Sequence, residues 1–459
     1  MFSKVLIANR GEIAVRIIRA CRELGIQTVA IYSEADAEAL HTQLADEAIC
    51  IGPAKAVDSY LNVQEVLSAA IVTKAEAIHP GFGFLSENSR FASMCEECNI
   101  TFIGPKSATI DAMGNKINAR QLMQEANVPV IPGSTGVLST VEEALEIADR
   151  IGYPVMLKAA AGGGGKGIRK VQSKEELPQH FSSAQQEAAA AFGNDDMYLE
   201  KIIYPARHIE VQILGDHFGN VIHLGERDCS LQRNNQKVLE ESPSVVISQT
   251  KREALGDAAV RAAKAVNYEN AGTIEVLMDE EGDFYFMEMN TRIQVEHPVT
   301  EMVTGIDLVK KQVEIAAGEP LNVCQEEVVF QGHAIECRIN AENPAFHFAP
   351  SPGKIQNLLL PAGGMGLRVD SAVYPGYTIP PYYDSMIAKI IVHGNTRFEA
   401  LMKMQRALSE FITEGIITNA EFQMDLISHP AVIAGDYSTA FLQEEFLPNW
   451  TPETEIGGA

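Results

Sequence analysis

The chain has 459 residues, more than one typical domain, so we expect two or three domains. It is 46% hydrophobic and 21% charged, as in a globular protein, and contains no apolar run long enough to cross a bilayer. The formal net charge of −25 argues against nucleic acid as a partner, because binding a phosphate backbone requires a basic surface. It does not exclude ATP, since a few local lysines and arginines reverse the sign inside a cleft.

The first residues and the cysteines both favour a cytoplasmic protein. The first residues lead straight into an apolar strand, so we expect no signal peptide and no membrane partner. Seven cysteines are scattered without a disulfide framework, which fits a reducing cytoplasm. Cys95 and Cys98 form a single CxxC motif without a second pair or a histidine cluster. We interpret them as ordinary thiols on a helix rather than as a zinc or redox site.

Strands and helices alternate through residues 4–103. Apolar strands are predicted at 4–8, 27–32, 48–51, 77–78 and 101–103, with helices at 12–24 and from residue 63. This βαβ pattern predicts a parallel sheet. The glycine-punctuated segment Ile78–Asn88 follows one of these strands, where open sheets place ligands. The alternative is a plain turn with a buried His79.

The next segment is expected to carry two capped helices. A helix that contains Lys116 should end before Pro129, and a lysine on a helix is usually solvated. Thr140-Val-Glu-Glu143 and Ser173-Lys-Glu-Glu176 are capping-box patterns and predict helix starts.

Between these two patterns, YPVMLKAAAGGGGKGIRKV predicts a strand, a glycine-rich loop and a second strand. It contains a GxGxxG match, but no helix opens at the glycines, and no Ser or Thr follows Gly165-Lys166 as a P-loop requires. We interpret it as a flap whose backbone N–H groups approach phosphates, with charge from Lys158 and Lys166. A flexible hairpin without a ligand is the alternative. The strands Tyr198–Ile203 and RHIEVQIL follow, the latter with His208 as either a core or a ligand-facing side chain.

A hairpin of two strands, Thr273–Met278 and Phe284–Met289, comes next. Glu275 and Glu288 each lie among apolar neighbours, and a buried carboxylate is costly unless a cation balances it. With Asn290 just beyond, they supply the oxygen ligands that Mg²⁺ prefers. A hairpin whose glutamates face solvent is the alternative.

Polar residues directly after this hairpin favour a metal-binding hairpin over one whose glutamates face solvent. Arg292, Gln294, Glu296 and His297 place a cation, an amide and a carboxylate beside the expected metal. Such a group can hold and deprotonate a small anion. The sequence therefore predicts a place where a small oxyanion meets a metal-bound nucleotide.

The last third is expected to contain a helix over Val303–Ala317, a strand over Gly332–Asn340, and a Pro-Pro turn followed by a strand over Tyr377–Lys389. The second of these carries Arg338, and a strand arginine is generally a surface ion pair. Asp384 is expected to be a structural anchor.

The segment EMNTRIQVEHPVTE resembles the active-site segment of biotin carboxylase, within the ATP-grasp superfamily. The similarity extends from IANRGEIAVRIIRACRELGI to YPGYTIPPYYDSMIAKI and covers nearly the whole chain. It implies an α/β and α+β protein with the ATP-grasp fold. The implied parts are an N-terminal Rossmann-like parallel-sheet domain (1–114), an ATP-grasp domain (115–330) with a mobile glycine-rich lid at about 131–203, a C-terminal mixed β domain (331–446) and a flexible tail (447–459).

By this resemblance the chain is an ATP-dependent ligase that carboxylates carrier-bound biotin with bicarbonate, through carboxyphosphate. The implied cofactors are ATP, Mg²⁺ or Mn²⁺, and biotin as the carrier-bound substrate. Glu296 is the expected general base, and Arg338 is expected to stabilise negative charge on the ureido oxygen of biotin. The implied catalytic set is Glu296, Arg292, Arg338 and Lys237, and the implied metal ligands are Glu275, Glu288 and Asn290. The implied bicarbonate contacts are Lys237, Arg292, Gln294 and Val295, and the implied biotin contacts are Phe82, Gly83 and Arg338.

The resemblance also implies a nucleotide site. Its residues are Lys116, Lys158, Gly163, Gly164, Gly165, Glu200, Lys201, Ile202, Ile203, His208, Gln232, Asn235 and Leu277. At Asn235 the sequence departs from many members of the family, which carry histidine there. Asparagine donates a hydrogen bond but carries no charge, so a charge role at this position is in doubt.

Partners are expected from the same resemblance. The chain stops soon after the biotin carboxylase region, so we expect a separate cytoplasmic subunit that acts with a biotin carboxyl carrier protein and carboxyltransferase subunits in an acetyl-CoA carboxylase of fatty acid synthesis. A subunit of a pyruvate or another acyl-CoA carboxylase is the alternative, and a non-catalytic ATP-binding regulator is disfavoured by the intact charged residues. Arg19, Glu23 and Arg368 resemble the dimer contacts of the family, which predicts a homodimer, although a solvated helix face would also account for them.

Overall fold

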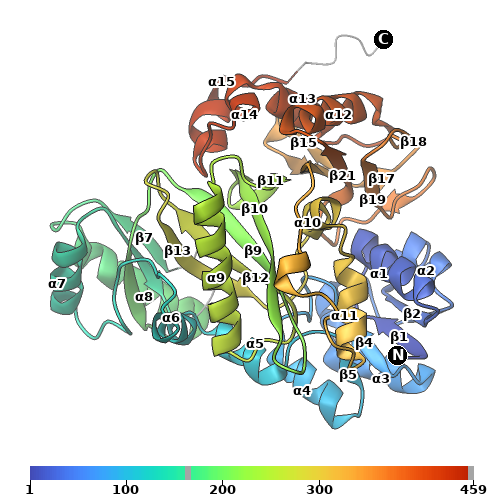
Figure 1. Cartoon of the computed structure of the whole chain (residues 1–459), viewed down its shortest axis with the longest axis horizontal. Coiled ribbons are helices and arrows are strands. Elements are labelled where there is room, and N and C mark those ends of the chain that lie inside the picture. Colours follow the sequence, from blue (N-terminus) through green and yellow to red (C-terminus); the bar gives the residue numbers. More distant parts are fainter. Residues whose placement is uncertain (161–166, 453–459) are drawn as a thin grey trace.

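A computed structural model describes residues 1–160 and 167–452 of the chain. Its N-terminal part, blue at the lower right of Figure 1, contains a five-stranded parallel sheet. The strand order is β3-β2-β1-β4-β5. Val5 and Ile7 of β1 pack with α1, while Leu6 packs with α3 on the other face, so the sheet is buried on both sides as parallel sheets are. The strands are β1 (Lys4–Ile7), β2 (Gln27–Tyr32), β3 (Glu47–Cys50), β4 (Ala77–His79) and β5 (Thr101–Phe102). The helices are α1 (Gly11–Glu23), α2 (Leu40–Leu44), α3 (Val63–Thr73), α4 (Ser89–Glu97) and α5 (Ser107–Gly114).

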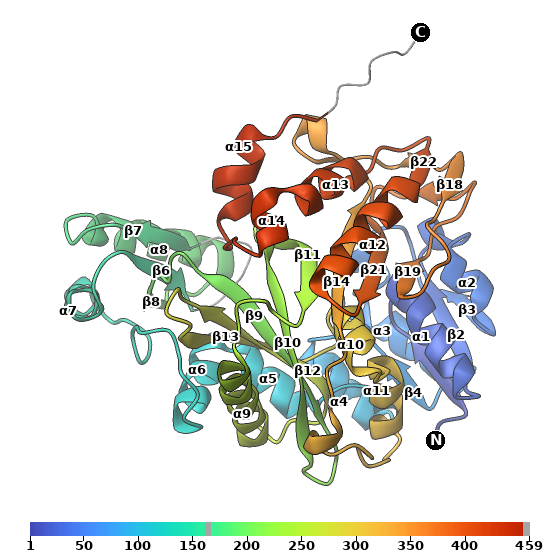
Figure 2. The same cartoon turned by 45° about the horizontal axis from the view of Figure 1, so that its top comes forward.

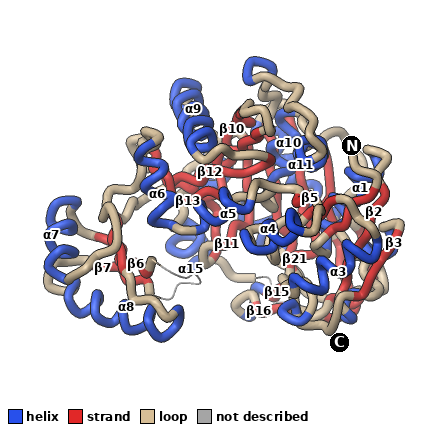
Figure 3. The backbone as a smooth tube through the Cα atoms, turned by 90° about the horizontal axis from the view of Figure 1, so that it is seen from below, coloured by secondary structure: helices blue, strands red, loops and turns tan. Residues whose placement is uncertain are grey.

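The lid follows as a small unit with its own core. Its antiparallel sheet has the order β7-β6-β8, and its buried apolar side chains all come from residues 138–199. Figure 3 shows it at the left edge of the molecule, apart from the N-terminal sheet. Its elements, with the helix that precedes them, are α6 (Lys116–Glu125), α7 (Val141–Ile151), β6 (Val155–Ala159), β7 (Ile168–Val171), α8 (Leu177–Phe192) and β8 (Met197–Lys201). The predicted phosphate-binding glycines Gly163, Gly164 and Gly165 lie outside the described residues.

An antiparallel sheet of eight strands forms the centre, with the order β13-β12-β9-β10-β11-β14-β21-β19. Three strands from the C-terminal part therefore extend the sheet of the preceding part, so that the two share one framework. The strands are β9 (Arg207–Gly215), β10 (Val221–Arg233), β11 (Gln236–Ser242), β12 (Asn270–Met278), β13 (Phe284–Asn290), β14 (His333–Asn340), β19 (Leu367–Ser371) and β21 (Met386–Gly394). The helices that pack on them are α9 (Gln249–Ala265), α10 (His297–Thr304), α11 (Leu308–Ala316), α12 (Arg397–Glu410) and α13 (Ala420–Ser428).

Short elements complete the C-terminal part, at the top of the view in Figure 2. They are β15 (Glu342–Asn343), β16 (Ala349–Pro350), β17 (Gly353–Lys354), β18 (Asn357–Leu359), β20 (Thr378–Ile379), β22 (Ile412–Glu414), α14 (Pro430–Ala434) and α15 (Leu447–Asn449). Trp450 packs on Phe348, Phe422 and Phe446, and its indole N–H donates to Asp425 at 2.8 Å. The expected tail therefore does not begin at residue 447, because this aromatic cluster holds the chain as far as Trp450. Residues 453–459 of the predicted tail lie outside the described part.

Two predicted helices differ from the structure for local reasons. The helix expected over Val303–Ala317 is two helices, because α10 ends at Gly305 with φ +71° and the Asp307 side chain caps α11 by accepting from Lys310 N. The capping box expected at Ser173 is absent, since α8 begins at Leu177 with a proline in its first turn. The other predicted cap is confirmed: Thr140 Oγ1 accepts from Glu143 N at 3.2 Å.

No helix in the ranges 1–160 and 167–452 is both long enough and apolar enough to cross a membrane.

Candidate active site

A cavity of about 1120 Å³ lies where the N-terminal sheet, the lid and the central sheet meet. The loops after β1 and β4, strands β6 and β8 of the lid, and the ends of β9 to β14 supply its walls. Sites for one small molecule typically measure about 300–1,000 Å³. The cavity therefore has room for a nucleotide together with smaller molecules.

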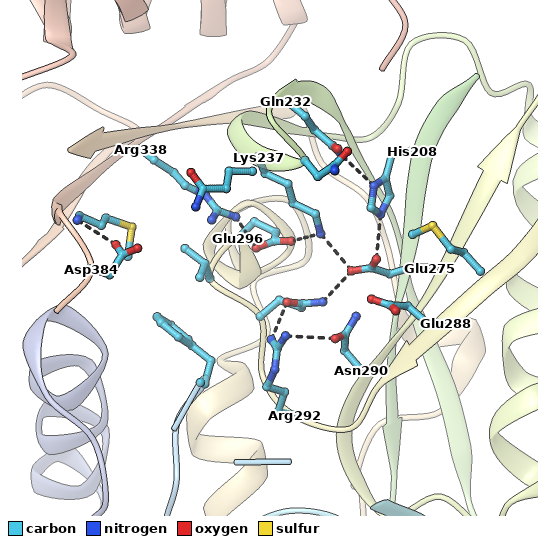
Figure 4. A pocket seen from close by; sticks show the side chains of 18 of the residues that line it. His208, Gln232, Lys237, Glu275, Glu288, Asn290, Arg292, Glu296, Arg338 and Asp384 are labelled. Carbon is cyan, nitrogen blue, oxygen red and sulfur yellow. Dashed lines mark hydrogen bonds and ion pairs between the residues drawn. The ribbon is translucent and has the colours of Figure 1, made fainter. Parts of the chain in front are cut away.

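The two carboxylates predicted to bind a metal face this cavity together. Glu275 and Glu288 are register partners on β12 and β13 (Figure 4). Glu275 accepts from His208 Nε2 and Gln294 Nε2, both at 2.9 Å, and pairs with Lys237 Nζ at 3.1 Å. Burial alone would raise the pKa of Glu275, but Lys237 and His208 outweigh it and hold this pKa well below its usual range. Burial and the nearby Glu275 raise the pKa of Glu288.

These residues fit a divalent cation. Glu275, Glu288 and the Asn290 amide line one cavity, and they offer the hard oxygen ligands that Mg²⁺ and Mn²⁺ take in nucleotide sites. Ligand atoms of His208, Glu210 and Glu275 also lie within 4.8 Å of one another. The raised pKa of Glu288 shows that this carboxylate is short of positive charge. A bound cation would supply that charge. Because both glutamates line the cavity, the alternative of a hairpin whose glutamates face solvent is wrong.

Lys237 connects three carboxylates at the floor of the cavity. Its Nζ lies 2.6 Å from Glu210 Oε2, 3.1 Å from Glu275 Oε1 and 2.6 Å from Glu296 Oε1. Arg227, which is fully buried, holds the other oxygen of Glu210. Although burial lowers it, the pKa of Lys237 is raised well above its usual value by these acids. Lys237 is thus a fixed positive charge beside the metal ligands.

Glu296 is buried at the start of α10 and carries two charged partners. Lys237 Nζ donates to its Oε1 at 2.6 Å, and Arg338 Nη2 donates to its Oε2 at 2.8 Å. Burial raises the pKa of Glu296, but Lys237 and Arg338 hold it well below the usual range. Arg338 is therefore no surface ion pair: it joins Glu296 to Glu240, whose Oε1 lies 2.6 Å from Arg338 Nε. Burial, against the effect of Arg338, raises the pKa of Glu240 to about 7.

The loop after β13 presents Arg292 to the cavity. Its guanidinium donates to Gln294 Oε1 at 2.6 Å and to Asn290 Oδ1 at 3.0 Å. Glu87, from the N-terminal part, accepts from Arg292 Nε at 2.8 Å and from Thr291 N at 3.1 Å. The N-terminal part thus fixes the loop that carries the predicted anion-binding residues.

The nucleotide side of the cavity joins the lid to the central sheet. Glu200 of β8 accepts from Lys158 Nζ at 2.6 Å and from Arg120 Nη1 at 3.2 Å. His208 is buried against Glu275 and hydrogen bonds through Nδ1 with Gln232 Nε2 at 2.7 Å. All of these except Arg120 line the cavity, so His208 is a cavity-facing residue rather than a plain core histidine.

Other predicted nucleotide residues also line the cavity. Ile202 and Ile203 follow the end of β8, and Leu277 lies on β12. Lys201 turns its ammonium away to the carbonyl oxygens of residues 152 and 153, at 2.9 and 3.3 Å. Its ammonium group is thus already paired within the lid, and its backbone N–H donates to the carbonyl oxygen of Pro132 at 2.7 Å. Asn235 lies in the tight turn between β10 and β11 with φ +64°.

Among the predicted residues that the structure describes, Lys116 does not line this cavity. Lys116 starts α6 and lines a small separate cavity with Arg120 and Tyr198. Its ammonium still acts electrostatically on Glu288, lowering a pKa that burial raises.

The predicted biotin side contains residues that sequence reasoning missed. Phe82 and Gly83 line the cavity, and Asn9 Nδ2 holds this loop by donating to the carbonyl oxygen of Phe82 at 2.7 Å. Arg10 also lines it, with its guanidinium 4.1 Å from the centre of the Tyr383 ring. The contact between Arg10 and Tyr383 was not predicted, because the two residues belong to turns far apart in the sequence. The Tyr-Tyr pair before Asp384 was the available signal. Asp384 is exposed, lines the cavity and accepts from Met386 N at 2.9 Å, so its role as a structural anchor stays a prediction.

The CxxC cysteines lie on α4 and at its C-terminal end. Cys95 is buried on α4 and Cys98 is exposed at its end. Among the described residues, the groups able to hold a metal ion all lie in the cavity region.

Comparison with known proteins gives matches along almost the whole chain. Three family models match in succession: "Biotin carboxylase, N-terminal domain" at residues 1–110, "Carbamoyl-phosphate synthase L chain, ATP binding domain" at 115–324, and "Biotin carboxylase C-terminal domain" at 336–444. Biotin carboxylase 1 of Bacillus subtilis is 60% identical over 444 residues, which are 96% of this chain and 98% of that protein. A pyruvate carboxylase subunit of Methanothermobacter thermautotrophicus is 54% identical over 97% of this chain and 90% of that protein.

A solved structure agrees with these matches. The biotin carboxylase domain dimer of Hydrogenobacter thermophilus 2-oxoglutarate carboxylase, in complex with MgADP, ADP and bicarbonate, superposes with a TM-score of 0.93. It is 51% identical and covers 98% of this chain and 100% of that one.

Fold and site together define an ATP-grasp enzyme that uses ATP to activate a carboxyl donor. The chain belongs to the biotin carboxylase family, and it is an ATP-dependent ligase that carboxylates biotin.

Proposed function

We propose that the cavity performs both halves of this reaction, with each predicted residue in the role that its position supports. Glu275, Glu288 and Asn290 would hold Mg²⁺ or Mn²⁺, which when bound neutralises the phosphates of ATP. Lys158, His208 and Gln232 would contact the nucleotide, with the backbone around Lys201 serving the base. The observation that carries the proposal is the shared cavity itself, since the carboxylates and the anion-binding loop open into the same space.

Bicarbonate would bind between Lys237, Arg292, Gln294 and the backbone of Val295. A planar guanidinium grips a carboxylate-like anion at two points, which suits Arg292. Glu296 would remove the bicarbonate proton, so that the anion attacks the γ-phosphate of ATP, the bond to the β-phosphate breaks, and carboxyphosphate and ADP form. In the free enzyme Lys237 and Arg338 hold Glu296 at low basicity. An arriving anion competes for both cations, and its binding would therefore make Glu296 a stronger base.

Biotin would lie between Phe82, Gly83 and Arg338. Carboxyphosphate would break down to CO₂ and phosphate, phosphate would accept the N1′ proton of biotin, and the deprotonated N1′ would form the new bond to CO₂. Arg338 would then stabilise the negative charge that develops on the ureido oxygen. Its position supports this role, because it lines the cavity and touches Glu296.

The test is ATP hydrolysis with and without bicarbonate, and with added free biotin. We expect hydrolysis to require bicarbonate and to be stimulated by biotin. Nucleotide binding without turnover would instead support the regulator and contradict the proposal.

We further propose that the biotin is borne by a carrier protein and that acetyl-CoA is the final acceptor. The relative named Biotin carboxylase 1 supports this assignment, while the relative named as a subunit of pyruvate carboxylase supports the alternative. Supplying the purified chain with biotinylated carrier protein and either carboxyltransferase separates the two, since only the matching partner gives malonyl-CoA or oxaloacetate.

We also propose a homodimer, because the similar Hydrogenobacter structure is described as a dimer. In this chain Arg19 is exposed, Glu23 pairs with Lys310 at 2.6 Å, and Arg368 pairs with Glu301 and Asp370, both at 2.6 Å. Analytical ultracentrifugation tests the assembly. The cytoplasmic location stays a prediction.

The division at about residues 114 and 330 is likewise proposed. The successive family-model matches at 1–110, 115–324 and 336–444 support it.

A further inference from the structure

A lysine outside the cavity holds the loop that carries the proposed base. Lys389 lies on β21, and its side chain has no exposed surface. Its Nζ donates a 2.7 Å hydrogen bond to the carbonyl oxygen of Val295. Val295 lines the cavity between Gln294 and Glu296, whereas Lys389 does not line it. The lysine therefore contacts the main chain of the loop and not the space that substrates occupy.

The pairing of β14 with β21 explains why this lysine reaches the loop. Arg338 and Lys389 are direct register partners, so their side chains leave the same face of the sheet side by side. Arg338 binds the Glu296 carboxylate at 2.8 Å, and Lys389 binds the carbonyl group one residue earlier. Two neighbouring cations thus hold the side chain and the backbone of the same short segment.

Buried carboxylates keep Lys389 charged. Glu12 Oε1, on α1 of the N-terminal part, lies 3.2 Å from Nζ, and Asp370 on β19 is the other register partner of Lys389. Glu336 lies on the same face, two residues before Arg338. These acids raise the pKa of Lys389 against the effect of its burial. The ammonium group is accordingly a strong, charge-assisted donor to Val295.

Asp370 and Glu12 differ in how they depend on this lysine. Asp370 has its own partner, Arg368, at 2.6 Å. Glu12 makes no side-chain hydrogen bond, and Lys389 is the one cation paired with it in the part of the chain that the structure describes. Removing Lys389 alone would therefore strand Glu12, whereas neutralising Glu12 leaves the bond to Val295 in place.

We propose that Lys389 is a positioning residue for bicarbonate activation: it fixes the Val295 main chain and through it the placement of Glu296. The inference rests on the proposed bicarbonate site. Displacing a reacting group by about 1 Å can cost as much as 10²-fold in rate, so the loss of one backbone anchor should be visible in kinetics. Because Lys389 lies away from the nucleotide residues, the effect should fall on bicarbonate and spare ATP.

The first test is Lys389→Met, with KM measured separately for bicarbonate and ATP. We expect KM for bicarbonate to rise about tenfold or more and kcat to fall, while KM for ATP changes by less than about twofold. Lys403→Met is the matched control, because Lys403 Nζ also donates to a backbone carbonyl oxygen, that of His393, at 2.8 Å, on α12 away from the cavity. An unchanged KM for bicarbonate in Lys389→Met would overturn the proposal.

The second test separates positioning from charge balance. The double variant Lys389→Met/Glu12→Gln contains no stranded carboxylate at position 12 and still lacks the donor to Val295. We expect it to keep the raised KM for bicarbonate, and Glu12→Gln alone to stay within about twofold of the unmodified enzyme. Recovery of a normal KM in the double variant would show that Lys389 only neutralises Glu12. Its failure to fold or to bind ATP would show that Lys389 holds the fold, and either result overturns the proposal. If the unmodified enzyme needs no bicarbonate, the proposed function fails instead.

Discussion

Neighbouring residues of β11 belong to two clusters of buried charge with opposite character. Glu241 faces an anchor cluster, in which it accepts from His333 Nε2 at 2.6 Å, from Arg397 Nε at 2.7 Å and from the Tyr437 hydroxyl. Burial raises the pKa of Glu241, but His333 and Arg397 lower it to about 2. Glu240 faces the site cluster, which we define as Glu210, Lys237, Glu240, Glu275, Glu296 and Arg338. There burial prevails over the single guanidinium and raises the pKa of Glu240 to about 7.

The two clusters differ in the number of cationic side chains that pair with each carboxylate. In the anchor cluster two basic side chains and a hydroxyl serve one carboxylate, and the group is complete by itself. In the site cluster Lys237 is shared by three carboxylates, and Arg338 by two. The shared cations still hold the pKa values of Glu275 and Glu296 below the usual range, but Glu288, which lies beside the cluster and shares neither cation, is left short of positive charge and has a raised pKa. The anchor cluster is therefore expected to stabilise the fold, and the site cluster to be completed by ligands.

The largest expected effect is on turnover, with Glu296→Gln. The amide keeps the size of the side chain but cannot accept the bicarbonate proton, so bicarbonate-dependent ATP hydrolysis should fall by roughly 10²- to 10⁴-fold. ATP binding, measured by calorimetry, should persist because Glu296 has no contact with the predicted nucleotide residues of the lid. Glu241→Gln is the control, a buried glutamate of the other cluster, and it should keep near-normal turnover at neutral pH. Equal losses in the two variants would contradict the distinction between the clusters.

Glu241→Gln should show its effect in stability instead. The pKa of Glu241 lies at about 2 in the folded protein, below the ordinary value of 4.5, so its ionised form stabilises the fold fully above pH 4.5. This contribution is on the order of 3 kcal/mol and is lost as the pH falls from about 4.5 to 2. Denaturant unfolding at pH 7 should therefore show the variant less stable, and the difference in unfolding free energy should shrink as the pH falls below 4.5 and disappear below about pH 2. A difference that does not depend on pH would mean that the charge of Glu241 is not what matters.

Glu288→Gln should act in the opposite direction in the free enzyme. Since burial and Glu275 raise the pKa of Glu288, its ionised form destabilises the fold at neutral pH, and removing the charge should leave the melting temperature equal or higher. The rise in melting temperature on adding MgATP should shrink, because tenfold weaker binding removes about 1.4 kcal/mol of ligand stabilisation.

Glu281→Gln, in the exposed turn of the same hairpin, is the control for this pair of measurements. It should change neither the melting temperature of the free protein nor its response to MgATP. If Glu288→Gln responds to MgATP as strongly as this control, Glu288 is not a metal ligand.

The site could be predicted from the sequence where its residues lie close together along the chain. Glu275, Glu288, Arg292 and Glu296 lie within one hairpin and its exit loop, so alternation and polarity were enough to predict that they act together. Burial of the strands then followed from their apolar neighbours. The parallel sheet of the N-terminal part was predictable for a similar reason, because strand–helix alternation is a local pattern, whereas the ATP-grasp fold was predicted from the family resemblance.

What escaped prediction depends on partners distant in sequence. Lys389 looks like one polar residue in an apolar strand, and only the register of β14 with β21 brings it to Val295, 94 residues away. Arg10 and Tyr383 meet across the interface of the N-terminal and C-terminal parts in the same way. The misplaced start of α8 has a local cause, since a proline suited only to the first turn outweighed a capping pattern at Ser173.

The smallest expected effect is at Asn235, in the turn between β10 and β11, where the resemblance implies histidine in many members of the family. Asn234 and Asn235 form a two-residue turn between partners Arg233 and Gln236, with φ +51° and +64°. Such turns need the left-handed region, which asparagine and histidine both enter more readily than most residues. The backbone therefore accepts Asn235→His, and unfolding free energy should change by less than about 0.5 kcal/mol.

Asn235→Val tests this interpretation, because a β-branched residue is strained at positive φ and should cost about 1–3 kcal/mol. KM for ATP separates geometry from charge. If the turn only shapes the mouth of the cavity, Asn235→His should change KM by less than about fivefold at pH 8, where an ordinary histidine is neutral. A tenfold lower KM for ATP that appears only near pH 6 would show that a positive charge at this turn favours ATP binding. The edge of the nucleotide site would then, like Glu288, be short of positive charge.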